Sequence, residues 1–259
     1  MTGVLPTILV FIFGVIIGSF LNVCIYRLPR NLSIVRPPSS CPSCGEPIHG
    51  YDNIPILSYL LLKGRCRDCG GAISIRYLAI EFMTGVFFVM LLWLFGLSIE
   101  LAIYMLFVSL LIVISFIDLE FTIIPDILSV GGLVAGLAIS FFRPDFGIID
   151  AILGVLLGGG VLWAIAFFYE LLRKREGMGG GDIKLLGMIG AFCGIQGVIF
   201  TLIAGSFMGA LVGIPLTFKK QEGMTYALPF GPFLSFGAFV YIIAGDPLVR
   251  ALNGFLGGG

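Results

Sequence analysis

The sequence has few charged residues: Asp, Glu, Lys and Arg make up only 12% of the chain, whereas hydrophobic residues make up 58%. Soluble domains carry about 25% charged residues, so a water-soluble globular domain is excluded. The chain also has a single histidine, His49, and it lacks a P-loop and a GxGxxG stretch. These absences argue against a Ser–His hydrolase, a P-loop nucleotidase and a dinucleotide-binding enzyme. The zero net charge gives no indication of nucleic-acid binding.

Long apolar runs without charge fill most of the chain instead. They cover residues 1–26, 82–99, 101–117, 127–142, 151–169, 185–218 and 223–245. A membrane-spanning helix needs roughly 20 mainly apolar residues, so six of these runs fit one span each. The run 185–218 is long enough for two, and Gly194 and Gly197 allow a turn in its middle. The sequence therefore predicts an all-α polytopic membrane protein with eight transmembrane helices.

The distribution of positive charge predicts the orientation. A signal peptide has basic residues before its apolar core, but here Arg27 and Arg30 follow the first run, which indicates a retained helix with its N-terminus outside. Alternating spans then place seven Lys and Arg of segment 27–77 in the cytoplasm, together with six more in 173–184 and 219–222. Only two of the 15 lie outside, in agreement with the positive-inside rule.

Segment 27–77 is the one sizeable stretch of mixed composition. It contains CPSC at 41–44 and CRDC at 66–69, two CxxC pairs separated by 21 residues. This spacing is typical of a zinc ribbon, in which four thiolates bind one Zn²⁺ tetrahedrally. Disulfides are the alternative, but they do not persist in a reducing cytosol. We therefore predict Cys41, Cys44, Cys66 and Cys69 as zinc ligands, and a small cytosolic zinc domain inserted between the first and second helices.

Two aspartates fall at one depth on the cytoplasmic side of this topology. Asp118 lies at the end of the third span, and Asp182 lies where a cytoplasmic loop meets the sixth. Each has a simpler interpretation, because Asp182 could cap a helix and Asp118 could merely end one. Together, two carboxylates that share a site hold one proton between them, which suits the activation of water against a peptide carbonyl. We predict them as a catalytic pair.

The loops next to Asp118 and Asp182 contain residues that could help to position the catalytic pair or the substrate. Gly179, Gly180 and Gly181 precede Asp182, and glycines allow a substrate backbone to approach closely. Pro125 and Asp126 follow Asp118, although Asp126 could equally cap the next helix. A transporter could place acids at a glycine-broken helix, but its polar groups should lie at mid-membrane, where these spans carry almost no charge. A non-enzymatic assembly factor that docks through the zinc domain stays open as the other alternative.

Several motifs, taken in order, resemble one family. They are GSFLNVCIYRLPR at 18–30, the paired CxxC motifs, YDNIPILSYLLLKGRCRDCG at 51–70, the D(x)6IPD run from Asp118 to Asp126, GGGD at 179–182 and PFGPFL at 229–234. The chain is thereby identified as similar to the type IV prepilin peptidases, bifunctional leader peptidases and N-methyltransferases of the GxGD type. The resemblance runs from about residue 10 to about residue 235.

The resemblance implies an activity and a location. Such enzymes of the bacterial inner membrane remove the basic leader of type IV prepilins and of pseudopilins after a glycine, on the cytoplasmic side. They then methylate the new N-terminal residue with S-adenosylmethionine. The catalytic aspartates of the family correspond to Asp118 and Asp182, and its zinc ligands to the four cysteines.

The segment associated with methyltransferase activity in this family is matched less completely by this sequence. The family segment SIRYPxxE reads SIRYLAIE here, with Leu78 in the proline position. Arg76 and Glu81 match, and they are the candidate methyltransferase residues, although Glu81 could simply pair with Arg76. The expected division is a first helix over 1–26, a zinc domain over 27–77 and a peptidase core over 78–259.

Overall fold

The computed structural model describes residues 3–143, 146–173, 179–219 and 229–256. These residues are helical apart from loops and two isolated β-bridges, Ser40–Pro47 and Arg65–Ala72. The chain forms two compact units, one ending at Val113 and the other beginning at Ile114. The predicted all-α class is confirmed.

The first unit holds three long helices and a loop region. Helix α1 runs over Val4–Arg27, α3 over Ile75–Phe95, and α4 begins at Ile99 and ends at Phe121, beyond the unit boundary. Between α1 and α3 lie the short 3-10 helices η1 (Leu28–Arg30) and η2 (Gly50–Asn53) and the helix α2 (Leu57–Leu61).

Glycines bring α1 and α3 together. A Cβ added to Gly14 would lie 2.8 Å from the Cα of Gly85, and one added to Gly18 would lie 2.7 Å from the Cα of Glu81. Such close approach of helix backbones is typical of membrane interfaces built on small residues. Asn22 extends this contact, because its side-chain amide donates to the Tyr77 carbonyl across the two helices at 3.1 Å.

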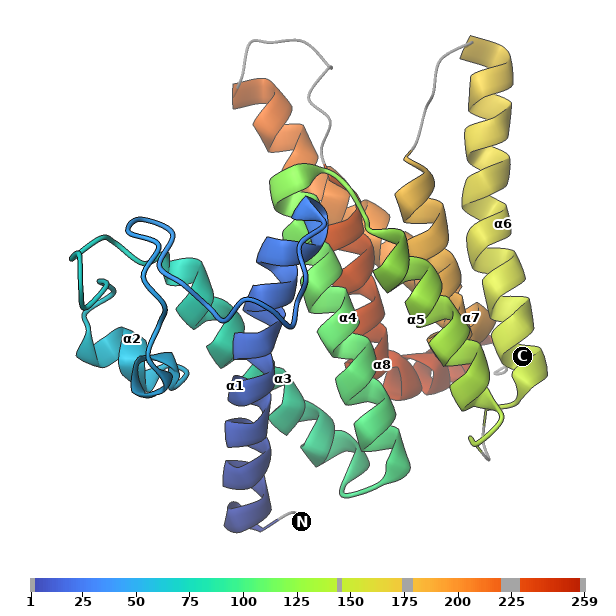
Figure 1. Cartoon of the computed structure of the whole chain (residues 1–259). Helices are drawn as coiled ribbons and strands as arrows, with labels where there is room; N and C mark the ends of the chain where they lie inside the picture. Colours follow the sequence, from blue (N-terminus) through green and yellow to red (C-terminus); the bar gives the residue numbers. More distant parts are fainter. Residues whose placement is uncertain (1–2, 144–145, 174–178, 220–228, 257–259) are drawn as a thin grey trace. The chain divides into compact units, whose positions relative to one another are not determined.

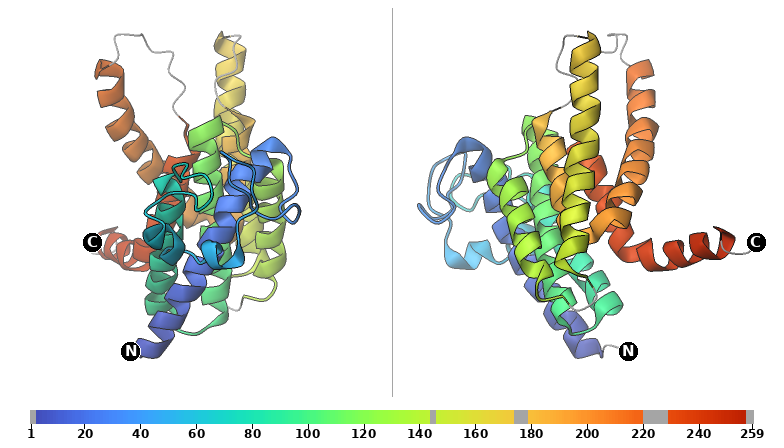
Figure 2. Two further views of the ribbon diagram at one scale, coloured as in Figure 1. Left: turned by 60° about the vertical axis from the view of Figure 1, so that its left-hand side comes forward. Right: turned by 90° about the vertical axis from the view of Figure 1, so that its right-hand side faces the viewer.

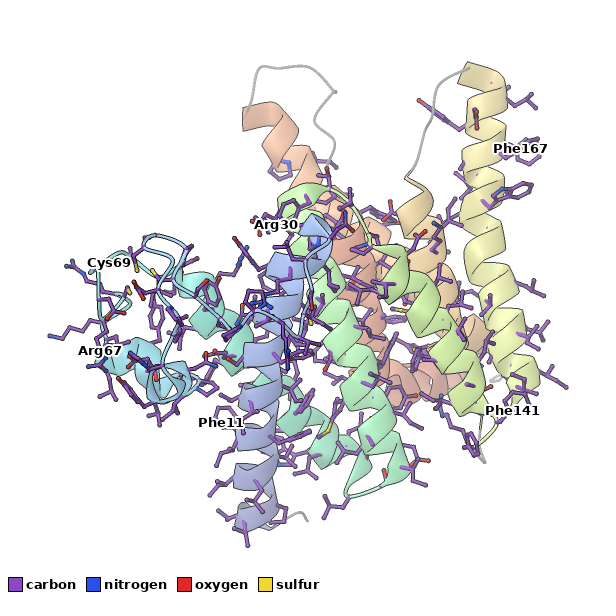
Figure 3. All side chains as sticks on the ribbon, viewed as in Figure 1. Phe11, Arg30, Arg67, Cys69, Phe141 and Phe167 are labelled. Carbon is purple, nitrogen blue, oxygen red and sulfur yellow. The ribbon has the colours of Figure 1, made fainter. Side chains whose placement is uncertain are left out.

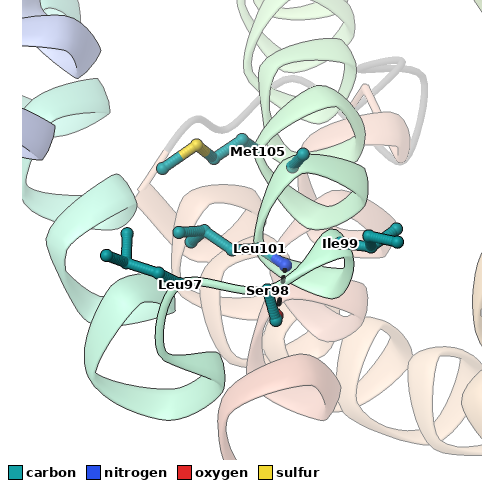
Figure 4. A pocket seen from close by; sticks show the side chains of 6 residues that line it. Leu97, Ser98, Ile99, Leu101 and Met105 are labelled. Carbon is teal, nitrogen blue, oxygen red and sulfur yellow. Dashed lines mark hydrogen bonds between the residues drawn. The ribbon is translucent and has the colours of Figure 1, made fainter.

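An apolar pocket of about 490 Å³ opens where α3 turns into α4 (Figure 4). Its lining has one polar side chain and no ionisable group: Leu97, Ser98, Ile99, Leu101, Ala102 and Met105. Ser98 itself accepts a hydrogen bond from the backbone N–H of Leu101 at 3.2 Å. This pocket therefore offers no group that could perform acid–base chemistry.

The second unit is organised around α7. It comprises the end of α4, α5 (Asp126–Ser140), α6 (Ile148–Arg173), α7 (Gly180–Lys219) and α8 (Gly231–Leu256). Helix α7 packs against α5, α6 and α8, all three of which lie beside it in Figures 1 and 2. Glycines again set the spacing: a Cβ on Gly158 would lie 2.5 Å from the Leu186 carbonyl oxygen, and one on Gly237 would lie 2.8 Å from that of Thr201.

Helix α7 is broken where the sequence predicted a turn. Gly194 has φ 66° and ψ −169°, which is not helical. The guanidinium of Arg143 donates to the Phe192 carbonyl at 2.9 Å, just before the break, and it lies 4.3 Å from the centre of the Phe146 ring. A cation at the C-terminal end of a helix segment is favoured by the helix dipole, so the break is stabilised as well as permitted.

Five helices of the described residues are long and apolar enough to cross a bilayer. They correspond to α1, α3, α4, α6 and α7, whereas the apolar stretches Asp126–Ser140 and Gly231–Gly245 are shorter. This agrees with a multi-pass membrane protein. The count of eight spans stays a prediction, as do the domain boundaries 1–26, 27–77 and 78–259; part of the run 223–245 lies outside the described residues.

Candidate active site and metal centre

Asp118 is a buried carboxylate near the end of α4, with 5% of its surface exposed. Its Oδ2 accepts a hydrogen bond from the backbone N–H of Gly231, the first residue of α8, at 3.0 Å. A Cβ on Gly231 would lie 2.7 Å from the same Oδ2, so this contact requires glycine. The first turn of a helix has free N–H groups, and the start of α8 uses one of them to orient the Asp118 carboxylate.

Asp182 lies in the first turn of α7, two residues after the helix begins at Gly180. Its backbone N–H donates to the Gly179 carbonyl at 3.1 Å. The Asp182 carboxylate lies close enough to Asp118 for the two charges to interact electrostatically. The two predicted catalytic residues therefore lie near each other within the second unit.

Ile124 explains how the two helix starts come together. Its side chain would be 2.9 Å from a Cβ on Gly181 and 3.2 Å from one on Gly231. The same isoleucine therefore contacts the residue before Asp182 and the residue that donates to Asp118.

The supporting loop residues take different positions. Gly179 directly precedes α7, Gly180 is its first residue, and a Cβ on Gly180 would meet open space. Pro125 is the N-cap residue of α5, and Asp126 is its first helical residue, so Asp126 does not cap that helix. Its carboxylate instead pairs with Lys184 of α7 at 2.6 Å. Both side chains are exposed, so the pair contributes little free energy, but it links the start of α5 to the start of α7.

The four predicted metal ligands form one cluster. The Sγ atoms of Cys41, Cys44, Cys66 and Cys69 all lie within 4.8 Å of one another. Those of Cys41 and Cys69 are 3.9 Å apart, close to the roughly 3.8 Å expected between two sulfurs at 2.3 Å from a tetrahedral zinc. Figure 3 labels Cys69 beside the other sulfur atoms of this loop region. The donor set fits a tetrahedral thiolate metal ion.

The two CxxC loops have the same backbone geometry. Cys41 donates to Glu46 and accepts from Gly45, and Cys66 donates to Gly71 and accepts from Gly70. Gly45 and Gly70 both have positive φ, at 77° and 69°, a conformation that glycine adopts without a steric cost. The backbone N–H groups of Cys44 and Ser43 lower the pKa of the Cys41 thiol to about 6, and a metal ligand must be a thiolate.

The candidate methyltransferase residues lie in the first two turns of α3. Glu81 is buried, and its Oε2 accepts a hydrogen bond from the backbone N–H of Ile56 at 2.7 Å. Arg76 is partly buried, with its guanidinium 5.8 Å from the centre of the Tyr77 ring. The structure thus gives Glu81 a partner in the loop before α2, which sequence reasoning did not anticipate.

Comparison with known proteins gives two family matches. Residues 12–95 match the bacterial peptidase A24 N-terminal domain, and residues 105–214 match the type IV leader peptidase family. A prepilin leader peptidase/N-methyltransferase of Pseudomonas putida is 33% identical, with 95% of this chain and 93% of that protein covered.

The chain belongs to the type IV leader peptidase family. A protein of the same name from Aeromonas salmonicida is 35% identical, with 93% of this chain and 92% of that protein covered. Another from Myxococcus xanthus is 41% identical, with 82% of this chain and 63% of that protein covered. No solved structure gives a significant match. As a member of this family the chain is an enzyme of the peptidase class, and the resemblance drawn from its motifs is confirmed. Asp118 and Asp182 lie in the second matched segment, and the four cysteines lie in the first.

Two residues of the site escaped sequence reasoning. Gly231 was part of a matching motif, PFGPFL, but its backbone donor has no side chain to draw attention to it. Ile124 resembles any other apolar residue of the chain. The signal that could have found both is their position: each lies next to a helix start that carries, or faces, an aspartate.

Proposed function

We propose that this protein is a membrane-embedded aspartic endopeptidase of the bacterial inner membrane. It removes the basic leader of type IV prepilins and pseudopilins after a glycine on the cytoplasmic side, and it methylates the new N-terminal amine. The names of its relatives support the substrate class and both activities. The observation that carries the aspartic mechanism is the juxtaposition of Asp118 and Asp182, supplied by two helices that are distant in sequence.

The geometry suits a water-activation mechanism. The carboxylates share one proton, because two neighbouring acids do not ionise together easily. The ionised member takes a proton from water, and the resulting hydroxide attacks the scissile carbonyl carbon while the protonated member donates to the carbonyl oxygen. Collapse of the tetrahedral intermediate breaks the C–N bond, and a proton passes to the leaving amine. Gly231 holds Asp118 in one orientation throughout these steps.

The remaining parts of the proposal concern the first unit. Cys41, Cys44, Cys66 and Cys69 would hold one zinc ion, which cross-links two loops that have little core of their own. S-adenosylmethionine supplies the methyl group, and Arg76 and Glu81 remain the candidate methyltransferase residues.

Mass spectrometry of a processed substrate tests the proposal. Detergent-solubilised protein is incubated with a prepilin, and the product is examined for loss of the leader and for an added methyl group. We expect Asp118→Asn and Asp182→Asn to abolish leader removal, a loss of at least about 10³-fold for a residue that acts within a catalytic unit. Asp150→Asn, at an exposed carboxylate in the first turn of α6, is the matched control and should retain activity. Full activity of either the Asp118→Asn or the Asp182→Asn variant would show that the replaced aspartate is not catalytic.

A further inference from the structure

The helix α2 exposes an apolar face that no described residue of the first unit covers. Leu57, Leu60 and Leu61 are spaced i, i+3 and i+4, so they lie on one side of the helix. Their exposed fractions are 57%, 58% and 81%. Ser58, on the other side, is buried. In a water-soluble domain an apolar stripe of this kind would face the core, and here the orientation is reversed.

The depth of α2 along the spanning helices follows from its anchor. Glu81, which accepts from Ile56 just before α2, is six residues into α3. At 1.5 Å per residue this is about 9 Å from the start of a helix of about 31 Å. The hydrocarbon core of a bilayer is about 30 Å thick, so α3 has little length to spare outside it. Ser19 of α1, about 12 Å before the end of that helix, lies beside the same carboxylate.

Many backbone N–H groups around α2 donate within the segment, which suits contact with lipid. The N–H of Ile54 donates to Ser58 Oγ at 3.1 Å, and that hydroxyl donates to the Tyr51 carbonyl at 2.9 Å. Further backbone donors of this segment reach carbonyl oxygens within it: those of Leu57, Ser58, Leu60, Leu62, Lys63 and Gly64. Pairing of this kind lowers the cost of placing the segment in lipid.

Ile56 is held in a costly conformation at the entry to α2. Its φ is 62° and its ψ is −55°, and the N–H of Leu57 bonds back to the Pro55 carbonyl at 2.6 Å, which is a γ-turn. A β-branched residue with positive φ persists only where the surroundings impose it. The Glu81 carboxylate supplies that constraint and fixes the direction in which α2 leaves the turn.

We propose that α2 is an interfacial membrane anchor whose Leu57, Leu60 and Leu61 side chains insert among the lipid acyl chains beside α1 and α3. The exposed Lys63 and Arg65 follow directly, at the depth of the headgroups, where cations are attracted to anionic lipid. The anchor holds the cysteine cluster close to the bilayer surface. This inference rests on α1 and α3 being spans, and not on the catalytic role of the aspartates.

Lipid quenching of a single tryptophan tests the anchor. In the full-length chain, Trp93→Phe and Trp163→Phe remove the native tryptophans, and Leu61→Trp introduces the reporter. The protein is placed in nanodiscs of phosphatidylcholine and phosphatidylglycerol, with or without bromine on the upper acyl chain. We expect at least a two-fold loss of reporter fluorescence with brominated lipid. Glu46→Trp, two residues after Cys44 in the cysteine cluster, is the control and should lose little.

A second variant separates anchoring from misfolding. Glu81→Ala on the reporter background should reduce the quenching while the elution profile and metal content stay unchanged. Quenching of the Leu61→Trp reporter no greater than that of the Glu46→Trp control would overturn the proposal. The proposal would also be overturned if the Leu61→Trp reporter were not quenched by brominated lipid but its emission wavelength shifted on addition of a pilin peptide. That result would assign this face to a protein partner.

Discussion

A backbone donor and an apolar side chain position the two aspartates. The N–H of Gly231 fixes Asp118, and Ile124 contacts both Gly231 and Gly181. The aspartates themselves could be singled out from the sequence, because acids are rare near the ends of such apolar spans and the predicted topology puts these two on one side of the membrane. Gly231 and Ile124 could not be singled out, because a main-chain N–H and one further isoleucine cannot be recognised from composition or spacing.

Gly231→Ala should impair cleavage without removing either carboxylate. The added Cβ would lie 2.7 Å from Asp118 Oδ2, so the carboxylate must shift, and a displacement of about 1 Å can cost roughly 10²-fold in rate. The measurement is the initial rate of leader removal, compared with that of Gly131→Ala in α5, where a new Cβ meets open space. Equal rates for the two variants would show that the Gly231 contact does not position Asp118.

The break in α7 is the main departure from regular helix geometry in the second unit. The sequence indicated the break only through length, because the run 185–218 is too long for one span. Gly194 and Gly197 were equally suitable positions for the turn. The structure selects Gly194, whose φ of 66° and ψ of −169° lie in a region almost restricted to glycine. Arg143 and Phe146, which support the break, come from the segment between α5 and α6 and could not be paired with it from sequence alone.

Gly194→Ala should therefore destabilise the protein. A side chain in this backbone region costs about 1–3 kcal/mol, and the new Cβ would also lie 3.0 Å from the Phe146 ring. Thermal unfolding in detergent measures the effect. Gly160→Ala, in the middle of α6 with open space around it, should instead be neutral or stabilise by up to about 1 kcal/mol. A Gly194→Ala variant as stable as Gly160→Ala would contradict this account of the break.

The pair of CxxC loops is the element that sequence predicted most completely. The four cysteines and their spacing were apparent, because a metal site of this kind constrains residue type at fixed positions, and the structure brings the four Sγ atoms together. Their shared turn geometry had a signal too, since a glycine follows the second cysteine in both CPSCG and CRDCG.

Loss of these thiols should release the metal. We expect purified wild-type protein to carry about one zinc ion per chain, bound by four cysteines. Cys41→Ser combined with Cys44→Ser should lose it and leave the loop region open to proteolysis, because metal binding supplies folding free energy to small domains. Elemental analysis and limited proteolysis measure the two effects, and Cys24→Ala, at a buried thiol of α1, should keep its zinc. Wild-type protein without bound metal would refute the zinc assignment.

For the whole molecule, the charge-free apolar runs and their lengths predicted the all-α class, and each run overlaps a helix of the described residues. The predicted run 82–99 begins seven residues after the actual start of α3 at Ile75, because Arg76 and Glu81 interrupted it. Glu81 is tolerated within that helix because it is buried against the Ile56 N–H. Helix packing was not predictable in the same way, since nothing in the sequence marks which of the 37 glycines pair α1 with α3 and α7 with its neighbours.

The proposed dyad takes one carboxylate from α4 and the other from α7, with α5 and α6 between them in the chain. A ribosome must therefore have made well over half of the polypeptide before both acids exist in one molecule. A chain that is released before α7 is made, or cleaved between α4 and α7, lacks one of the two aspartates on one polypeptide. In the proposed mechanism such a chain is inactive. The proposed peptidase activity therefore depends on the synthesis of both helices.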